Sequence, residues 1–277
     1  MGNNETMAAY EQALLAAEKS DVTVAKYLRD ARAFLVFLGD RRLDKGETIA
    51  YKKKLCAGYA PASVNSMLAS LNSFLRFLGR EDCCVRLCRI QRQLFCNESR
   101  ELSREEYGRL LQAARGTRML FVLRTICETG IRVSELAYVT AEAVHRGKAV
   151  VQCKNKTRVI LLPKELQKLL KAYLKGEGIR SGAVFVTKNG KPLNRSNIWR
   201  GMKALCRRAK VAPRKVFPHN LRHLFARTFY HSCKDIVKLA DLLGHSSINT
   251  TRIYTAENGT AHRNRLEQVC RQLTFRL

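Results

Sequence analysis

The segment PHNLRH, residues 218–223, is followed further on by LGHSSINTTRIY, residues 243–254, and these two stretches decide how the rest of the chain is interpreted. In the first stretch, His219 and Arg222 are three residues apart, so on a helix their side chains share a face and can bind one small anion together. His223 is one turn from His219, the spacing of two zinc ligands on a helix, but the glutamate of the metalloprotease pattern is missing. We therefore favour an anion site over a zinc site.

A third stretch, TGIRVSEL at residues 129–136, places a glycine turn and Arg132 in front of a new helix. Free backbone amides at the start of a helix attract anions, and a guanidinium beside them can clamp a phosphate group. Taken alone, the pattern also fits a surface arginine that pairs with Glu135. Its agreement with the two other stretches makes the phosphate interpretation the stronger one.

Together the three stretches resemble the tyrosine recombinase or phage integrase family, and within it the short Xer-like members. The shared features are a glycine-arginine box followed by Ser-Glu-Leu, the motif His-x-Leu-Arg-His, and Leu-Gly-His with a tyrosine nine residues beyond the histidine. The resemblance covers residues 100–260 strongly, and residues 1–85 match only as a helical bundle. It implies a mainly α fold with a small β-sheet (α+β), in which an N-terminal core-binding domain precedes a catalytic domain.

The resemblance also implies a role for each matching residue. Tyr254 corresponds to the nucleophile, which attacks a DNA phosphodiester to form a 3′-phosphotyrosine and release a 5′-hydroxyl without ATP, metal or other cofactor. Arg132 and Arg222 match the arginines that hold the non-bridging phosphate oxygens, where charge grows in the transition state. His219 matches the histidine that accepts the tyrosine proton, and His245 the one that bonds a phosphate oxygen.

The lysine that protonates the leaving 5′-oxygen is the least direct match. The family carries it in a hairpin turn such as Gly-Lys-Gly-Asn-Lys, whereas this chain reads Cys153-Lys154-Asn155-Lys156, one residue shorter. Keeping the asparagine-lysine pair aligned favours Lys154, with Lys156 as the alternative. Glu135 matches an acidic position of the family that orients Arg132 and takes no part in the chemistry.

The first eighty residues read as a small helical bundle. Apolar residues recur at three- and four-residue steps over Thr23–Leu38 and Pro61–Leu78, and a glycine follows each of these segments. Shorter helices at Ala8–Lys19 and Glu47–Leu55 complete the four-helix module. A module that binds only another protein is the alternative interpretation for this part.

The resemblance and the helical pattern together predict that the chain is divided into three parts. These are a helical core-binding, SAM-like DNA-binding domain over residues 1–85, a linker over 86–101, and a catalytic domain with its tail over 102–277. The linker is rich in Cys, Arg and Gln and has no long apolar stripe. Ser103 and Glu106 form a capping-box pattern that opens the second domain.

Within the second domain, β-rich runs at Ala149–Cys153 and Arg158–Leu162 predict a hairpin around a polar turn. A further short strand is expected at Ala183–Thr187. The tail, Ala256–Leu277, carries an apolar helical stripe, which in this family docks on a neighbouring protomer; packing within its own chain is the alternative.

Composition agrees with a nucleic-acid partner. The chain carries 51 basic and 23 acidic side chains, a net charge of +28, and 35 of the basic residues follow residue 100. No apolar run approaches the roughly 18 residues of a membrane span, and no secretory signal is evident. The ten cysteines are interpreted as reduced thiols, and the group Cys83, Cys84, Cys88 and Cys96 lacks the spacing of a zinc site. A cytoplasmic, nucleoid-associated bacterial protein is expected.

The sequence therefore predicts a site-specific DNA recombinase that acts as a homotetramer on two double-stranded DNA sites, with an accessory protein as a further candidate partner. Two alternatives share parts of this prediction. One is a type IB topoisomerase or telomere-resolving enzyme, and the other is a catalytically silent DNA-binding relative. The sequence leaves open the target DNA and the choice between integration, excision, inversion and dimer resolution.

Overall fold

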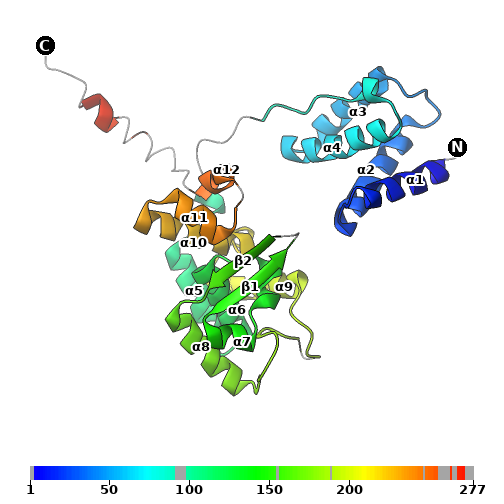
Figure 1. Cartoon of the computed structure of the whole chain (residues 1–277). Helices are drawn as coiled ribbons and strands as arrows, with labels where there is room; N and C mark the ends of the chain where they lie inside the picture. Colours follow the sequence, from blue (N-terminus) through cyan, green and yellow to red (C-terminus); the bar gives the residue numbers. More distant parts are fainter. Residues whose placement is uncertain are drawn as a thin grey trace, which may run out of the picture. The chain divides into compact units, whose positions relative to one another are not determined.

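A computed structural model gives the fold of the chain in two compact units, Met1–Arg92 and Gln93–Leu277 (Figure 1). No helix among the described residues is long and apolar enough to cross a membrane. The structure describes residues 3–90, 98–153, 156–187, 189–245, 247–254, 263 and 267–271.

The first unit is a bundle of four helices. They are α1 (Asn3–Ala16), α2 (Asp21–Leu38), α3 (Lys45–Gly58) and α4 (Pro61–Phe77), followed by the short 3-10 turn η1 (Glu81–Cys83). Pro61 occupies the first turn of α4, and Gly39 ends α2 with a φ of +55°. The expected helices are thus formed, although α1 begins five residues earlier than expected.

The core of this unit is the apolar stripe of α2 against that of α4. Phe34, Leu68 and Phe74 are fully buried there, and Tyr10 of α1 joins them while its hydroxyl donates to Ser73 Oγ at 3.0 Å. The segment after α4 stays attached to the bundle. There the side chain of Asn72 exchanges two hydrogen bonds with the backbone of Val85.

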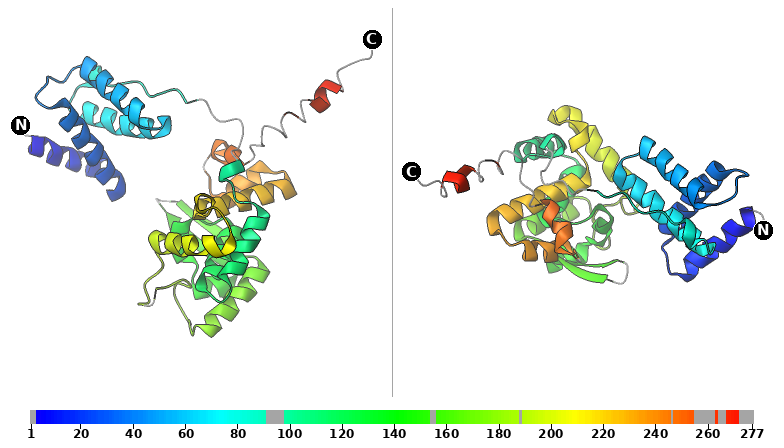
Figure 2. Two further views of the ribbon diagram at one scale, coloured as in Figure 1. Left: turned by 180° about the vertical axis from the view of Figure 1, so that it is seen from behind. Right: turned by 90° about the horizontal axis from the view of Figure 1, so that it is seen from above.

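Over its described residues the second unit is mainly helical, with a two-stranded hairpin (Figures 1 and 2). The expected mainly α architecture with a small sheet is confirmed. The elements in chain order are η2 (Glu98–Arg100), α5 (Arg104–Ala114), α6 (Arg118–Thr129), η3 (Val133–Tyr138), α7 (Ala141–Arg146), β1 (Lys148–Cys153), β2 (Lys156–Leu161), α8 (Lys164–Gly176), α9 (Arg195–Ala209), η4 (Pro213–Lys215), α10 (Pro218–Cys233), α11 (Ile236–Leu243), α12 (Ile248–Thr251) and η5 (Arg252–Tyr254).

Helix α6 is the centre of this unit, because it contacts α5, α8, α9 and α10. Val122, Leu123 and Ile126 on α6 are fully buried. The predicted capping box is present at the start of α5, where Ser103 Oγ accepts from the Glu106 amide at 3.1 Å and Glu106 accepts from the Ser103 amide. The core thus holds the C-terminal end of α6, where the glycine-arginine box begins, against α10.

The expected hairpin is formed, with its first strand starting one residue earlier and its second strand two residues earlier than expected. Strands β1 and β2 pair antiparallel from Lys148 opposite Leu161 to Cys153 opposite Lys156. The third strand expected at Ala183–Thr187 does not form: Ala183 and Val186 make only isolated bridge pairs, with Thr140 and Pro192, respectively. Proline has no amide hydrogen to extend a ladder, so the pairing stops there.

Candidate active site

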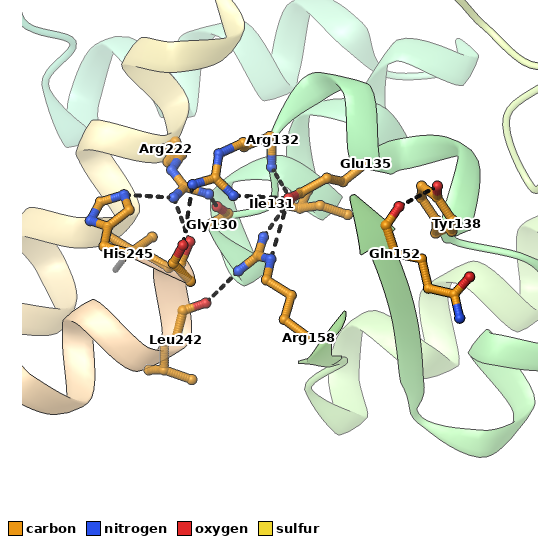
Figure 3. A network of polar contacts seen from close by, with 12 residues as sticks. Gly130, Ile131, Arg132, Glu135, Tyr138, Gln152, Arg158, Arg222, Leu242 and His245 are labelled. Carbon is orange, nitrogen blue, oxygen red and sulfur yellow. Dashed lines mark hydrogen bonds and ion pairs between the residues drawn. The ribbon is translucent and has the colours of Figure 1, made fainter. Parts of the chain in front are cut away.

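Three segments that are far apart in the sequence meet in the second unit and bring Arg132, Arg222 and His245 together (Figure 3). Gly130 allows this approach. It ends α6 in the left-handed region with a φ of +63°, and a Cβ atom there would lie 2.4 Å from the Phe225 ring on α10. Because glycine has no side chain, the end of α6 packs directly against α10.

The guanidinium of Arg222 joins the three segments. Only 2% of Arg222 is exposed, and its Nη1 donates to the Gly130 carbonyl at the end of α6. Its Nη2 donates to the Leu243 carbonyl at 2.7 Å and lies 3.0 Å from His245 Nε2. One buried side chain on α10 therefore fixes the end of α6 and the turn that follows α11.

Arg132 lies beside Arg222, is more exposed to solvent than Arg222, and is held by Glu135. The Arg132 side chain is 42% exposed, whereas that of Glu135 is 4% exposed. Glu135 accepts from the Arg132 amide at 2.8 Å and from Arg132 Nη1 at 2.9 Å. Burial raises the pKa of Glu135, but bonds from Arg158 and Arg132 outweigh it and hold the pKa below its usual value. This geometry agrees with the expectation that Glu135 orients Arg132.

The two arginines make the site attractive to an anion. Burial and the nearby charge of Arg132 lower the pKa of Arg222, while a hydrogen bond and the charge of Tyr254 act in the opposite direction. Like charges held side by side destabilise each other. A phosphate oxygen placed between the two guanidiniums would relieve that repulsion and accept hydrogen bonds from both.

The hydrogen bonds of His245 define its tautomer. A guanidinium can only donate, so Nε2 of His245 is the acceptor in its contact with Arg222. The proton is then on Nδ1, which donates to Thr251 Oγ1 at 2.8 Å. His245 is therefore a neutral imidazole whose orientation is set from both sides.

Tyr254 packs among three histidines and is 3% exposed. Its ring lies edge-on against His223 at 4.5 Å between centroids and stacks on His245 at 5.9 Å, while His219 is 6.4 Å away. The Nε2 atoms of His219 and His223 are 3.1 Å apart, so one of them donates to the other. Tyr254 is thus surrounded by imidazoles, and His223 is nearer to it than His219.

The histidines share a shift toward the neutral form. The pKa of His223 is lowered to about 4, chiefly by burial and then by the nearby His219 and Arg222. The pKa of His245 is also lowered to about 4, chiefly by burial and then by nearby arginines. The pKa of His219 is lowered by burial, then by Arg222 and Arg132. Near neutral pH the positive charge of the site therefore resides on its arginines.

These shifts predict that the protein loses stability in mild acid. In the unfolded chain these histidines bind protons near pH 6.5, whereas in the folded chain His223 and His245 bind them near pH 4. Their contribution to the free energy of unfolding is therefore complete above pH 6.5 and declines as the pH falls toward 4. With allowance for partial exposure, we expect the free energy of unfolding to fall by about 1–2 kcal/mol between pH 7 and pH 5. Urea unfolding at the two pH values measures it.

The control compares two histidine substitutions. His223→Gln should reduce the fall in stability between pH 7 and pH 5, whereas His145→Gln, at an exposed position on α7, should leave it unchanged. An equal fall in wild type and His223→Gln would contradict the assignment of this pH dependence to the site.

The sequence prediction gave no role to His223, which of the three histidines lies nearest to Tyr254, and it missed Arg158 on β2. Its side chain is 15% exposed and makes an ion pair with Glu135, and its Nη1 donates to the Leu242 carbonyl at 2.8 Å. A signal was available, since alternate residues of a strand share a face and Ile160, two positions on, is buried. An arginine on the inward face of a strand indicates a buried partner.

The candidate general acid cannot be placed in this site. Lys154 and Asn155 in the hairpin turn lie outside the described residues, and so does the side chain of Lys156. The described backbone brings Cys153 opposite Lys156 at the end of the hairpin.

Comparisons with known proteins agree with the motifs. Residues 100–260 match the family described as "Phage integrase family", and residues 7–82 match "Phage integrase, N-terminal SAM-like domain". The tyrosine recombinase XerA of Thermococcus kodakarensis is 30% identical over 264 residues, which cover 91% of this chain and 90% of the relative. The tyrosine recombinase XerD of Oceanobacillus iheyensis is 26% identical over 261 residues, covering 85% and 88%.

Two solved structures have similar folds. The crystal structure of XerA recombinase matches with 26% identity and a TM-score of 0.54, and the match covers 96% of this chain and 98% of that one. A lambda integrase dimer bound to a COC′ core site matches with a TM-score of 0.74 at 17% identity, covering 94% and 97%. The second match concerns the fold alone.

Proposed function

The chain belongs to the phage integrase family and is a site-specific tyrosine recombinase, and on that premise we propose that Tyr254 is its nucleophile and that Arg132, Arg222, His219 and His245 serve the reaction around it. The observation that carries the assignment is a single cluster. Tyr254 lies in one cluster with Arg222 and His245. Arg132 donates to the Gly244 carbonyl, immediately before His245.

The reaction exchanges one phosphate ester for another. The phenolic oxygen of Tyr254 attacks a DNA phosphorus, the bond to the 5′-oxygen breaks, and the 3′-phosphate remains linked to the enzyme. A free phenol has a pKa near 10, so it needs a base and nearby positive charge to lose its proton as it attacks. His219 accepts that proton, and Lys154 of the hairpin turn donates one to the leaving 5′-oxygen. Rejoining is the same transfer in reverse with another 5′-hydroxyl.

The histidine pair next to Tyr254 supports this proton path. Because the Nε2 atoms of His219 and His223 are 3.1 Å apart, a proton that reaches one ring can be shared with the other. Both rings have a lowered pKa, so at neutral pH they are in the form that can accept a proton.

The two arginines and His245 hold the phosphate. Arg132 and Arg222 donate to the non-bridging oxygens, on which charge grows in the transition state. His245 Nε2, which accepts from Arg222, becomes a donor to a phosphate oxygen once it is protonated. An anion beside it favours that protonation, since it stabilises the imidazolium form.

Double-stranded DNA is the substrate in this proposal, bound by the helical unit and the catalytic unit together. Structures in the family include a lambda integrase tetramer bound to a Holliday junction, which supports a homotetramer on two sites here. The net charge of +28 supports binding through phosphate contacts. We place the enzyme on cellular DNA in the cytoplasm, at the nucleoid. The proposed docking of the tail falls largely outside the described residues.

A trapped covalent intermediate tests the proposal. DNA flanking the gene is searched for inverted repeats about a short spacer. A duplex with that sequence is nicked beside the cleavage point, so that the short fragment released with a free 5′-hydroxyl diffuses away. We expect an adduct that resists detergent, is destroyed by protease, carries a label placed at the 5′ end of the cleaved strand and forms equally well in EDTA. An adduct that instead carries a label placed at the 3′ end of the cleaved strand, or relaxation of plasmids that lack any such site, would contradict the proposal.

A further inference from the structure

We propose that Arg158 is a positioning residue for cleavage, which holds Arg132 through Glu135 and fixes the turn that carries His245. This inference depends on the functions proposed above for Arg132 and His245. Arg158 lies on the hairpin and takes no direct part in the proposed mechanism.

The contacts of Arg158 point inward. Its Nη2 and Nε donate to the two carboxylate oxygens of Glu135, the second at 3.3 Å, and its Nη1 donates to the Leu242 carbonyl at 2.8 Å. All three nitrogen atoms of the guanidinium are thus used within the protein, and 15% of the side chain is exposed. Arg158 acts on DNA through other residues.

The turn after α11 is held by three guanidiniums on three successive carbonyls (Figure 3). Arg158 donates to Leu242, Arg222 donates to Leu243, and Arg132 donates to Gly244 at 3.4 Å. The last carbonyls of a helix have no partner within it and form the negative end of its dipole, so cations stabilise them. His245 follows immediately, and its position is therefore set by this row of contacts.

Close packing adds to these hydrogen bonds. Gly244 has a φ of +63°, and a Cβ atom there would lie 2.6 Å from Cδ of Arg158. The backbone of the turn therefore rests directly on the stem of Arg158. A shorter side chain at this position would remove this packing and leave the Leu242 carbonyl without its guanidinium donor.

Glu135 connects this support to Arg132. Its carboxylate is 4% exposed and accepts from two guanidiniums as well as from the Arg132 amide. Without Arg158 each carboxylate oxygen of Glu135 loses one bond and keeps one to Arg132, and a buried carboxylate with fewer bonds reorients toward those that remain. Arg132 would follow it. Arg158 belongs to β2, the strand that follows Lys154 in the sequence. Its contacts therefore also couple the hairpin to Arg132 and Arg222.

The first test measures cleavage in single-turnover reactions on the nicked duplex. Misplaced catalytic groups commonly cost about 10²-fold, so we expect Arg158→Gln to cleave about 10- to 100-fold more slowly with nearly unchanged DNA affinity. Arg158→Lys should recover only part of the rate, because an ammonium cannot bridge Glu135 and the Leu242 carbonyl as a planar fork does. A rate for Arg158→Gln within twofold of wild type would overturn the proposal.

A double-mutant cycle tests the path through Arg132. If Arg158 acts through it, the variant with both Arg132→Lys and Arg158→Gln should cleave little more slowly than Arg132→Lys alone. Fully additive losses would overturn that path.

Amide exchange tests positioning without any DNA, so it is decisive even if the nucleophile assignment fails. The amides of Arg132, Gly244 and His245 are bonded to Glu135, Asp241 and Ala240, respectively. Arg158→Gln should speed their exchange about tenfold. The control, Lys215→Met, removes another partly buried ion pair, with Glu106 at 2.9 Å, and should leave these three amides unchanged. Unchanged exchange in Arg158→Gln, or an equal change in the control, would overturn the proposal.

Discussion

Tyr254→Phe is expected to abolish the covalent DNA adduct, with a loss of about 10⁴-fold or more in cleavage rate. In the proposed mechanism the phenolic oxygen of Tyr254 forms the new phosphate ester, and phenylalanine has no atom that can replace it. Phenylalanine keeps the ring that packs against His223 and His245, and the side chain is 3% exposed, so the fold of the site should survive. The adduct is measured on the nicked duplex after denaturing electrophoresis.

A matched control separates the hydroxyl from general effects. Tyr230 on α10 packs at the edge of the same small apolar cluster as Tyr254, and Tyr230→Phe should form the adduct at close to the wild-type rate. Both variants should bind the duplex with affinities within a few-fold of wild type, because phosphate contacts over the whole interface dominate affinity. An adduct that persists in Tyr254→Phe would rule out this nucleophile.

Most of the helical fold was predictable because its signals are local. The stripe of α2 and α4 is the face that is buried, and Pro61 and Gly39 lie where their backbone preferences place them. Boundaries were less certain. Asp44 accepts from the Glu47 amide and so caps α3, which begins at Lys45 and not at Glu47 as expected, although the capping residue was visible in the sequence.

The third strand failed for a reason that local patterns do not reveal. Ala183–Thr187 has the residue types of a strand, but a strand also needs a partner along its length. The structure offers only single bridges to Thr140 and Pro192. Composition can indicate that a segment is suited to a sheet, whereas the presence of a free edge beside it depends on the whole fold.

The candidate site divides in the same way. The resemblance carried by the three sequence motifs pointed to Arg132, Arg222, His245 and Tyr254, and the structure brings these four residues together. The contacts of Arg158 were not predictable, because Glu135 is 23 residues away and Leu242 is 84 residues away along the chain. Such contacts follow from tertiary packing.

Arg222→Lys is expected to slow cleavage by about 10³-fold, the second largest effect in this site. Lysine retains the charge but presents it as a compact ammonium, which cannot hold the carbonyls of Gly130 and Leu243, the ring of His245 and a phosphate oxygen in one plane. Because Arg222 is 2% exposed, the lost bonds also leave buried carbonyls without donors, and we expect a stability loss of about 1–3 kcal/mol.

The stability loss must be separated from the loss of chemistry, and Arg227→Lys on the same helix makes that possible. Arg227 is also partly buried, and it holds Glu101 and donates to the Leu102 carbonyl at 2.8 Å. The same replacement there should lower the free energy of unfolding while the cleavage rate stays within a few-fold of wild type. Both variants are compared well below their unfolding temperatures. If Arg222→Lys cleaved within tenfold of Arg227→Lys, Arg222 would be a structural arginine only, and the charge that develops on the phosphate would have to be stabilised elsewhere.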